Sequence, residues 1–71
     1  MEVQAMSPMS PGRRVRLERV RLGLTQAQLA ERAGLLRRTV TEFELGRRKP
    51  TDTTVHKLSA ALDIDPEELL P

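Results

Sequence analysis

The chain has 71 residues, a net charge of +2, no cysteine and a single aromatic residue, Phe43. This length allows one small domain; the lack of cysteine excludes a disulfide framework and thiolate metal sites, and a lone histidine, His56, cannot form a metal or catalytic centre. No apolar run approaches the roughly 18 residues of a membrane span and the start lacks a signal-peptide core, so we expect a soluble cytoplasmic protein without a membrane partner.

The first predicted helix follows a segment that carries no helix or strand signal. Residues 1–9 lack hydrophobic periodicity, which predicts a disordered N-terminal arm, and the domain is expected to cover residues 10–71. Ser10 and Pro11 stand in the order of a cap and a first helical residue. We therefore predict a helix from this point to about Leu22, where a glycine follows.

The next two helices are predicted from a capping box and two glycines. Thr25 and Gln28 have the spacing of a capping box, so a second helix begins there, and Gly34 ends it. A third helix is predicted over about residues 37–45, because Gly46 provides the next stop.

Two more helices are predicted in the remaining chain. Thr51 is a cap for a fourth helix over about residues 52–62, whose apolar residues recur at helical spacing. Asp65 and Pro66 then begin a last, short helix, with two glutamates in its first turn. Five short helices joined by short loops predict an all-α fold, a compact five-helix bundle.

The second and third helices together have the pattern of a helix-turn-helix. The steep crossing of such a pair tolerates only a small side chain, which Ala30 provides, and the tight turn needs positive φ, which Gly34 accepts. Apolar residues stand where the two helices would meet: Leu29, Ala33, Leu35, Val40 and Phe43. The alternative to a DNA-binding helix-turn-helix is an ordinary helical hairpin.

The third helix has the side chains that a recognition helix would place in the major groove of DNA. Arg37 lies at its exposed start, and Arg38, Thr41 and Glu42 project away from the apolar side. An arginine there can bond bidentately to guanine, and Thr41 can contact a thymine methyl group or a phosphate. Glu42 either accepts a hydrogen bond from cytosine or orients Arg38 one turn earlier, and we favour the orienting role.

Positive charge is concentrated in the first two thirds of the chain. Residues 13–49 contain eleven Lys and Arg against four Glu, a charge of +7, whereas residues 50–71 have a charge of −4. This asymmetry favours a polyanionic partner for the first part. We expect contacts to DNA phosphates from the residues Gln26, Arg47, Arg48 and Lys49. The alternative for the three consecutive cations is a basic loop without a partner.

Two charged residues fall on inner helix faces. Arg19 lies among apolar residues of the first helix, and Glu44 lies on the inner face of the third. Because a buried charge needs a partner, the simplest solution is an ion pair between Arg19 and Glu44. The alternative is that both side chains extend to water.

These residues resemble the Cro/cI-type (XRE-like) helix-turn-helix family of phage and bacterial transcriptional regulators. The resembling stretches, within about residues 12–70, are RLERVRLGLTQAQLAERAGL, TVTEFELGRRKPT and LSAALDIDPEELL. The resemblance implies a lambda-repressor-like DNA-binding domain of five helices, a homodimer on a palindromic operator, and no cofactor. The base contacts it implies are Arg37, Arg38, Thr41 and Glu42, its phosphate contacts are Gln26 and residues 47–49, and its internal ion pair is Arg19 with Glu44. Where the family commonly has Ser or Thr before the recognition helix, this chain has Leu36.

The function we expect is sequence-specific DNA binding by a transcriptional regulator, a repressor or small controller protein acting at the nucleoid. Two alternatives stay open: an antitoxin-type regulator that also binds a toxin, and a protein-bridging module that resembles a coactivator. An enzyme is not expected, because no nucleophile, base or metal set converges, and the acidic residues near the end are explained by capping and helix-dipole effects. Apolar residues near the end either pair two copies or cover the domain's own core: Leu62, Ile64, Leu69 and Leu70.

Overall fold

The computed structural model of the chain describes residues 9–70, and most of the arm predicted over residues 1–9 lies outside the described residues. The described elements are α1 (Pro11–Arg21), α2 (Gln26–Ala33), α3 (Arg37–Glu44), α4 (Asp52–Leu62) and the 3₁₀ turn η1 (Pro66–Leu69). All of the secondary structure in this part of the chain is therefore helical, as the sequence predicts. No helix within residues 9–70 is long and apolar enough to cross a membrane.

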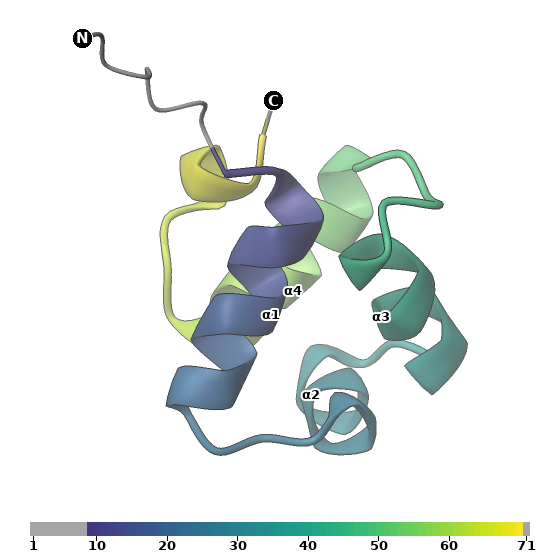
Figure 1. The fold of residues 1–71 in the computed structure, drawn as a ribbon, viewed down its shortest axis with the longest axis vertical. Coiled ribbons are helices and arrows are strands. Elements are labelled where there is room, and N and C mark those ends of the chain that lie inside the picture. Colours follow the sequence, from purple (N-terminus) through teal and green to yellow (C-terminus); the bar gives the residue numbers. More distant parts are fainter. Residues whose placement is uncertain (1–8, 71) are drawn as a thin grey trace, which may run out of the picture.

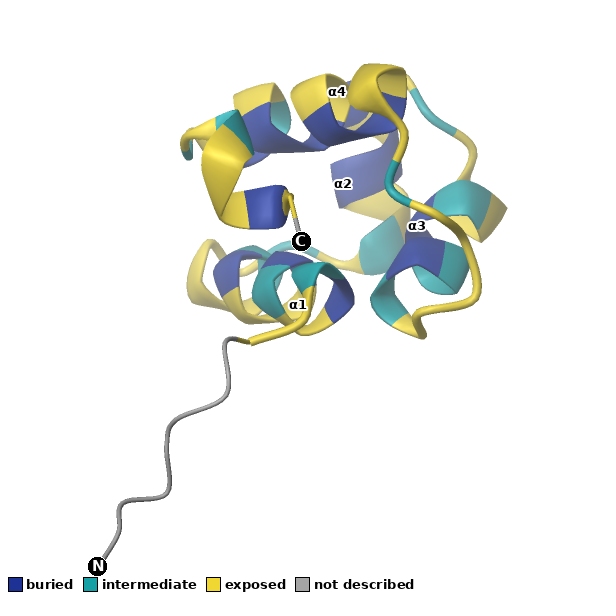
Figure 2. Cartoon of the chain, turned by 90° about the horizontal axis from the view of Figure 1, so that it is seen from above, coloured by how far each residue is buried: buried dark blue, intermediate teal, exposed yellow. Residues whose placement is uncertain are grey.

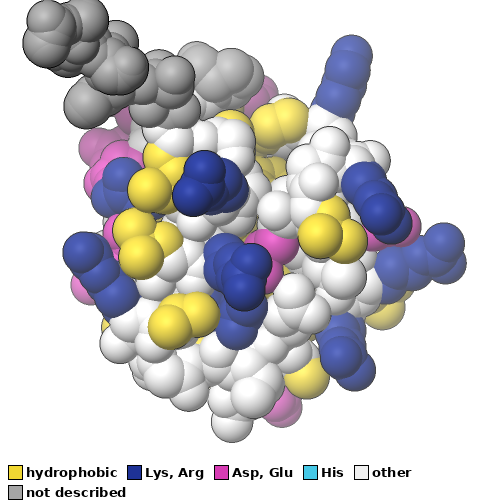
Figure 3. Space-filling model, viewed as in Figure 1, with side chains coloured by type: hydrophobic (Ala, Val, Ile, Leu, Met, Phe, Trp, Pro, Cys, Tyr) yellow, Lys and Arg dark blue, Asp and Glu magenta, His cyan; other side chains and the backbone are white. Residues whose placement is uncertain are grey.

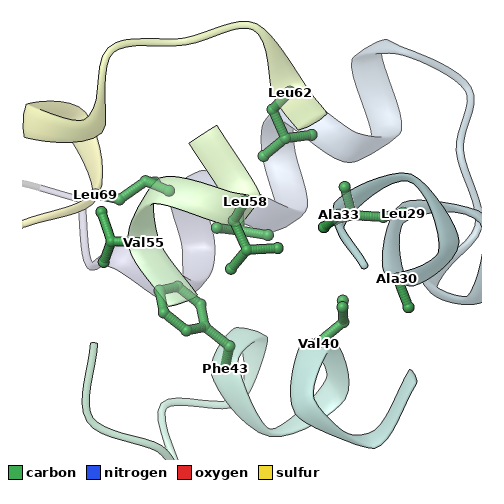
Figure 4. Packing of buried hydrophobic residues seen from close by; sticks show 10 residues of the cluster. Leu29, Ala30, Ala33, Val40, Phe43, Val55, Leu58, Leu62 and Leu69 are labelled. Carbon is green, nitrogen blue, oxygen red and sulfur yellow. The ribbon is translucent and has the colours of Figure 1, made fainter. Parts of the chain in front are cut away.

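The helices enclose a single core. Helices α1 and α4 lie on opposite sides of it, α2 and α3 close one end, and η1 packs against α1 and α4 at the other end (Figures 1 and 2). The fully buried apolar side chains come from all five elements: Val15, Leu29, Val40, Phe43, Val55, Leu58 and Leu69. Phe43 points from α3 toward Val55 and Leu58 of α4, so the one aromatic residue joins α3 to the rest of the core (Figure 4).

Side-chain caps account for where most helices begin. The Ser10 hydroxyl accepts a hydrogen bond from the Arg13 amide before α1. In the capping box of α2, the Gln28 amide donates to Thr25 Oγ1 over 3.0 Å and the Thr25 amide donates to Gln28 Oε1 over 2.9 Å. Thr51 caps α4 in the same way. These bonds satisfy amides that have no partner inside the helix, which fixes the starting residue.

Helix α3 is the exception, since it begins without a side-chain cap. Leu36 occupies the cap position with the extended backbone of a cap residue, but its side chain makes no hydrogen bond and is 74% exposed. The orientation of α3 therefore depends on its packing and on the preceding turn. In that turn Gly34 has φ +69°, and the Leu35 amide donates to the Ala30 carbonyl over 2.9 Å. Ala30 is buried where α2 meets α3, as the crossing requires.

The last predicted helix is wrong in type, because the element is a single 3₁₀ turn and the described chain has four α-helices. Asp65 does cap it, by accepting from the Glu67 amide over 2.9 Å. The Glu68 and Leu70 amides, however, donate to carbonyls three residues earlier, and Leu70 is already extended. This tighter turn is typical of a segment with room for only one turn. It brings Leu69 fully into the core between α1 and α4.

Three of the four apolar residues near the end cover the domain's own core, and one is exposed. Leu62 and Leu69 are buried in the domain's own core, and Ile64 packs partly against it. Leu70 remains 44% exposed. Of these four residues, Leu70 alone has an exposed side chain.

A glycine at the start of α1 allows this helix to approach α3 closely. A Cβ atom at Gly12 would lie 2.7 Å from the carbonyl oxygen of Glu44, and it would also overlap the carbonyl oxygen of Phe43. Both atoms belong to backbone that cannot move away as a side chain can. Gly12 thus sets the distance between α1 and the end of the recognition helix.

Candidate nucleic-acid interface

The N-terminal part of α3 is exposed on the side opposite its buried residues. Val40 and Phe43 face the core, while Arg37 and Arg38 are exposed in the first turn. The Arg38 side chain is 83% exposed. Two adjacent guanidinium groups therefore stand at the helix end where recognition helices contact base edges.

Glu42 connects the recognition helix to the loop that follows it. Its Oε2 accepts a hydrogen bond from Arg38 Nε over 3.2 Å, and its Oε1 accepts one from Arg48 Nη2 over 2.9 Å. The bonds from Arg48 and Arg38 lower the pKa of the Glu42 carboxyl below its ordinary value. Both carboxylate oxygens are engaged by arginines, so the geometry fits an orienting role for Glu42 better than a direct contact to cytosine.

Thr41 and Gln26 are hydrogen-bonded to each other across the helix-turn-helix. Thr41 Oγ1 donates to Gln26 Oε1 over 2.9 Å, and Gln26 Nε2 donates to Glu44 Oε1 over 3.0 Å. Both Gln26 and Thr41 are half-buried. These bonds fix the start of α2 against the middle of α3.

Arg19 and Glu44 form the internal ion pair that their positions predict. Arg19 Nε donates to Glu44 Oε2 over 2.6 Å and Arg19 Nη2 donates to Oε1 over 3.0 Å, a bidentate arrangement. Arg19 Nη1 also donates to the Leu24 carbonyl over 2.9 Å. The hydrogen bond to Glu44 raises the pKa of Arg19 above its ordinary value, although burial opposes this. The arginine is charged throughout the pH range of the folded protein, and the pair joins α1 to α3.

The loop after α3 presents its cations on the surface. Gly46 has φ +75° and ends α3, and the Arg47 amide donates back to the Glu42 carbonyl over 2.9 Å. Arg47, Arg48 and Lys49 are all exposed. Arg48 is held by Glu42, whereas Arg47 and Lys49 make no ion pair among the described residues.

The basic residues are distributed over more than the helix-turn-helix. In Figure 3, Lys and Arg side chains stand over α3 and its following loop, and others stand over α1, on either side of a shallow hollow. The hollow has a volume of about 180 Å³ and is lined by Arg16, Arg19, Gln26, Thr41, Glu44 and Leu45. No group of three or more potential metal-ligating side chains is present within residues 9–70.

Sequence reasoning missed two features of α1. One is Arg16 at the hollow, which could have been found because it precedes Arg19 by three residues and so lies on nearly the same side of the helix. The other is a charge cluster in which Arg14 donates to Glu18 over 2.8 Å and also pairs with Glu68 of η1. The spacing of Arg14 and Glu18 indicates the first contact, but the contact with Glu68 depends on the tertiary fold.

Comparisons with known proteins agree with the helix-turn-helix arrangement of the chain. A family model described as "Helix-turn-helix" matches residues 15–69. An uncharacterized HTH-type transcriptional regulator of Methanothermobacter thermautotrophicus is 44% identical over 48 residues, which cover 68% of this chain and 70% of that protein.

Two solved structures are similar over most of the chain. The restriction-modification controller protein C.AhdI from Aeromonas hydrophila is 42% identical, with a TM-score of 0.79 over 84% of this chain and 91% of that one. The P22 c2 repressor, solved with a synthetic operator, is 29% identical, with a TM-score of 0.82 over 87% of this chain and 94% of that one.

Proposed function

The chain belongs to the helix-turn-helix family and is a DNA-binding transcriptional regulator of the Cro/cI type, and we propose that it acts as a repressor or small controller protein, bound as a homodimer to a palindromic operator. The observation that carries this proposal is the exposed pair Arg37 and Arg38 at the start of α3, opposite the buried face of that helix. In this proposal the protein binds DNA at the nucleoid in the cytoplasm, without a catalytic step, a metal or a cofactor.

In this proposal α3 lies in the major groove and its first two turns read base edges. Arg37 and Arg38 donate to guanine, and Thr41 contacts a neighbouring base or phosphate. Glu42 holds Arg38 and limits the directions in which its guanidinium can point. A restrained arginine loses less conformational freedom on binding, which favours selectivity for one base.

In this proposal, phosphate contacts come from both sides of α3. On one side are Gln26 and the first backbone amides of α2, which carry the partial positive charge of a helix start. On the other side are Arg47, Arg48 and Lys49, which are exposed beside α3. These contacts set affinity and register, whereas base contacts set the preferred sequence.

The small size of one domain supports the homodimer of this proposal. One domain with a single short recognition helix contacts few base pairs, and two-fold pairing doubles the site and makes it palindromic. The exposed Leu70 is one candidate for the shared surface. The sequence alternatives, a toxin-binding antitoxin and a protein-bridging module, are not favoured by the relatives described above, which are transcriptional regulators and a restriction-modification controller protein.

Selection of bound sites from a randomised DNA library, carried out at two salt concentrations, tests the proposal. We expect an enriched palindrome whose half-site centres lie about one helical turn, roughly 34–36 Å, apart. Arg38→Ala should relax the base preference at one position in each half-site, whereas Arg48→Ala should weaken binding to all DNA sequences equally. Weak binding without enrichment at both salt concentrations would contradict the proposal.

A further inference from the structure

Arg16 lies on α1, outside the helix-turn-helix, yet it borders the same hollow as residues of the proposed interface. The hollow receives Gln26 from the start of α2 and Thr41 from α3, and Leu45 at the end of α3 closes it. Gln26 and Thr41 are hydrogen-bonded to each other there. Arg16 therefore stands across the hollow from side chains to which the proposed function gives DNA contacts.

The position of Arg16 is fixed by contacts of α1 on both sides of it. One turn before it, Gly12 lies against the backbone at the end of α3, and one turn after it, Arg19 is bound to Glu44. Residues 12, 16 and 19 lie along one side of the helix. Because both neighbours hold α1 against α3, the base of the Arg16 side chain keeps a set distance from the recognition helix.

The charge of Arg16 is not balanced within the described part of the chain. Arg14 and Arg21 of α1 pair with Glu18, and Arg19 pairs with Glu44, whereas Arg13 forms no ion pair within residues 9–70 but does not line the hollow. Arg16 is exposed and forms no ion pair within residues 9–70. The one carboxylate at the hollow, Glu44, already accepts hydrogen bonds from Arg19 and Gln26. The hollow thus offers an unneutralised guanidinium to a bound anion.

We infer that Arg16 binds a backbone phosphate of the operator, next to the phosphate at the start of α2, so that α1 is a third DNA-contacting helix. This inference rests on the proposed function. A guanidinium presents a planar set of donors that matches two phosphate oxygens. Figure 3 shows the arrangement that this requires, with basic side chains over α1 on one side of the hollow and over α3 on the other.

Arg16→Gln tests this inference against the matched control Arg32→Gln. Arg32 is an exposed arginine in the last turn of α2, away from the lining of the hollow, and it forms no ion pair among the described residues. Both changes remove one positive charge and leave a polar side chain. Affinity for the selected operator is measured by fluorescence anisotropy over a series of salt concentrations, for wild type, both variants and Arg16→Lys.

We expect Arg16→Gln to lower the salt slope of log K by about 1 per protein chain, and affinity by about five-fold per chain near 0.15 M salt, without a change in base preference. Arg16→Lys should retain most of the slope, and Arg32→Gln should match wild type. Melting temperatures of all variants should agree, because Arg16 is exposed.

Three other outcomes separate the inference from the proposed function. Equal slopes and affinities for Arg16→Gln and Arg32→Gln would overturn the inference, with the proposed function intact. A changed preference at one base pair would also overturn it, since Arg16 would then contact a base. If wild type selects no DNA site at all, the proposed function itself fails.

Discussion

Removal of the Glu44 carboxylate by Glu44→Ala should destabilise the domain by about 3 kcal/mol. In the folded protein the Glu44 side chain is 4% exposed and that of Arg19 is 13% exposed. The substitution removes two hydrogen bonds from Arg19 and one from Gln26, and it leaves Arg19 with the Leu24 carbonyl alone. Breaking one side of a buried pair costs about 3–5 kcal/mol, and the small exposure of Arg19 places this case at the lower end.

The effect is large for a domain of this size. Stability of about 0.05–0.15 kcal/mol per residue gives the whole chain about 4–10 kcal/mol. Because 1 kcal/mol shifts the melting temperature of such a domain by about 4–8 °C, we expect Tm to fall by about 12–24 °C. Thermal unfolding followed by circular dichroism at neutral pH measures this shift.

The matched control is Glu31→Ala, because Glu31 is an exposed glutamate of α2 that forms no ion pair within residues 9–70. Its Tm should stay within a few degrees of wild type, as is usual for surface substitutions. If Glu44→Ala and Glu31→Ala have the same melting temperature, Arg19 reaches water without Glu44, and the argument from burial is refuted. The double variant Arg19→Met with Glu44→Leu should recover much of the loss, since an apolar pair leaves no unpaired charge.

Gly12→Ala should destabilise the domain by about 1–3 kcal/mol, because its Cβ would overlap backbone at the end of α3; equal urea midpoints for variant and wild type would contradict this. Leu36→Ser should stabilise the domain by about 1 kcal/mol, since a hydroxyl there can cap α3, and a lower Tm would show that the leucine contributes more than a cap. The pKa of the Glu42 carboxyl lies below the ordinary value for glutamate. The ion pairs of Glu42 are therefore fully formed at pH values above the ordinary pKa, and they are lost as the pH falls through the lowered pKa. An NMR titration of the Glu42 carboxyl carbon should therefore give a midpoint below that of an unpaired glutamate, and Arg48→Ala should raise it.

Local interactions explain why the sequence predicts the first four helices well. The caps Ser10, Thr25 and Thr51 each bond to the amide three residues later, so a short window of sequence contains both partners. The ion pair of Arg19 with Glu44 is long-range, but it follows from the fact that each charge lies on an inner helix face. Such predictions need only the period of the helix and the requirement that buried charges be paired.

Other features depend on how the elements come together. The Asp65 cap and the following proline predict that a helix begins, but they do not determine how many turns follow, and the element ends as one 3₁₀ turn. The bond from Arg48 to Glu42 depends on the path of a loop. The contact of Arg14 with Glu68 joins residues 54 positions apart. In each case the tertiary fold brings together groups that no local pattern connects.

The hydrogen bonds that run from Thr41 through Gln26 and Glu44 to Arg19 bear on any redesign of the recognition helix. Thr41 is a surface position of α3, but its hydroxyl is one end of a chain of polar groups that reaches α1. Transplanting a foreign recognition helix that lacks a donor at position 41 would leave the Gln26 side-chain oxygen without that bond, and the amide group would then be held by Glu44 alone. Engineered variants should therefore exchange positions 19, 26, 41 and 44 together, as one transferable unit.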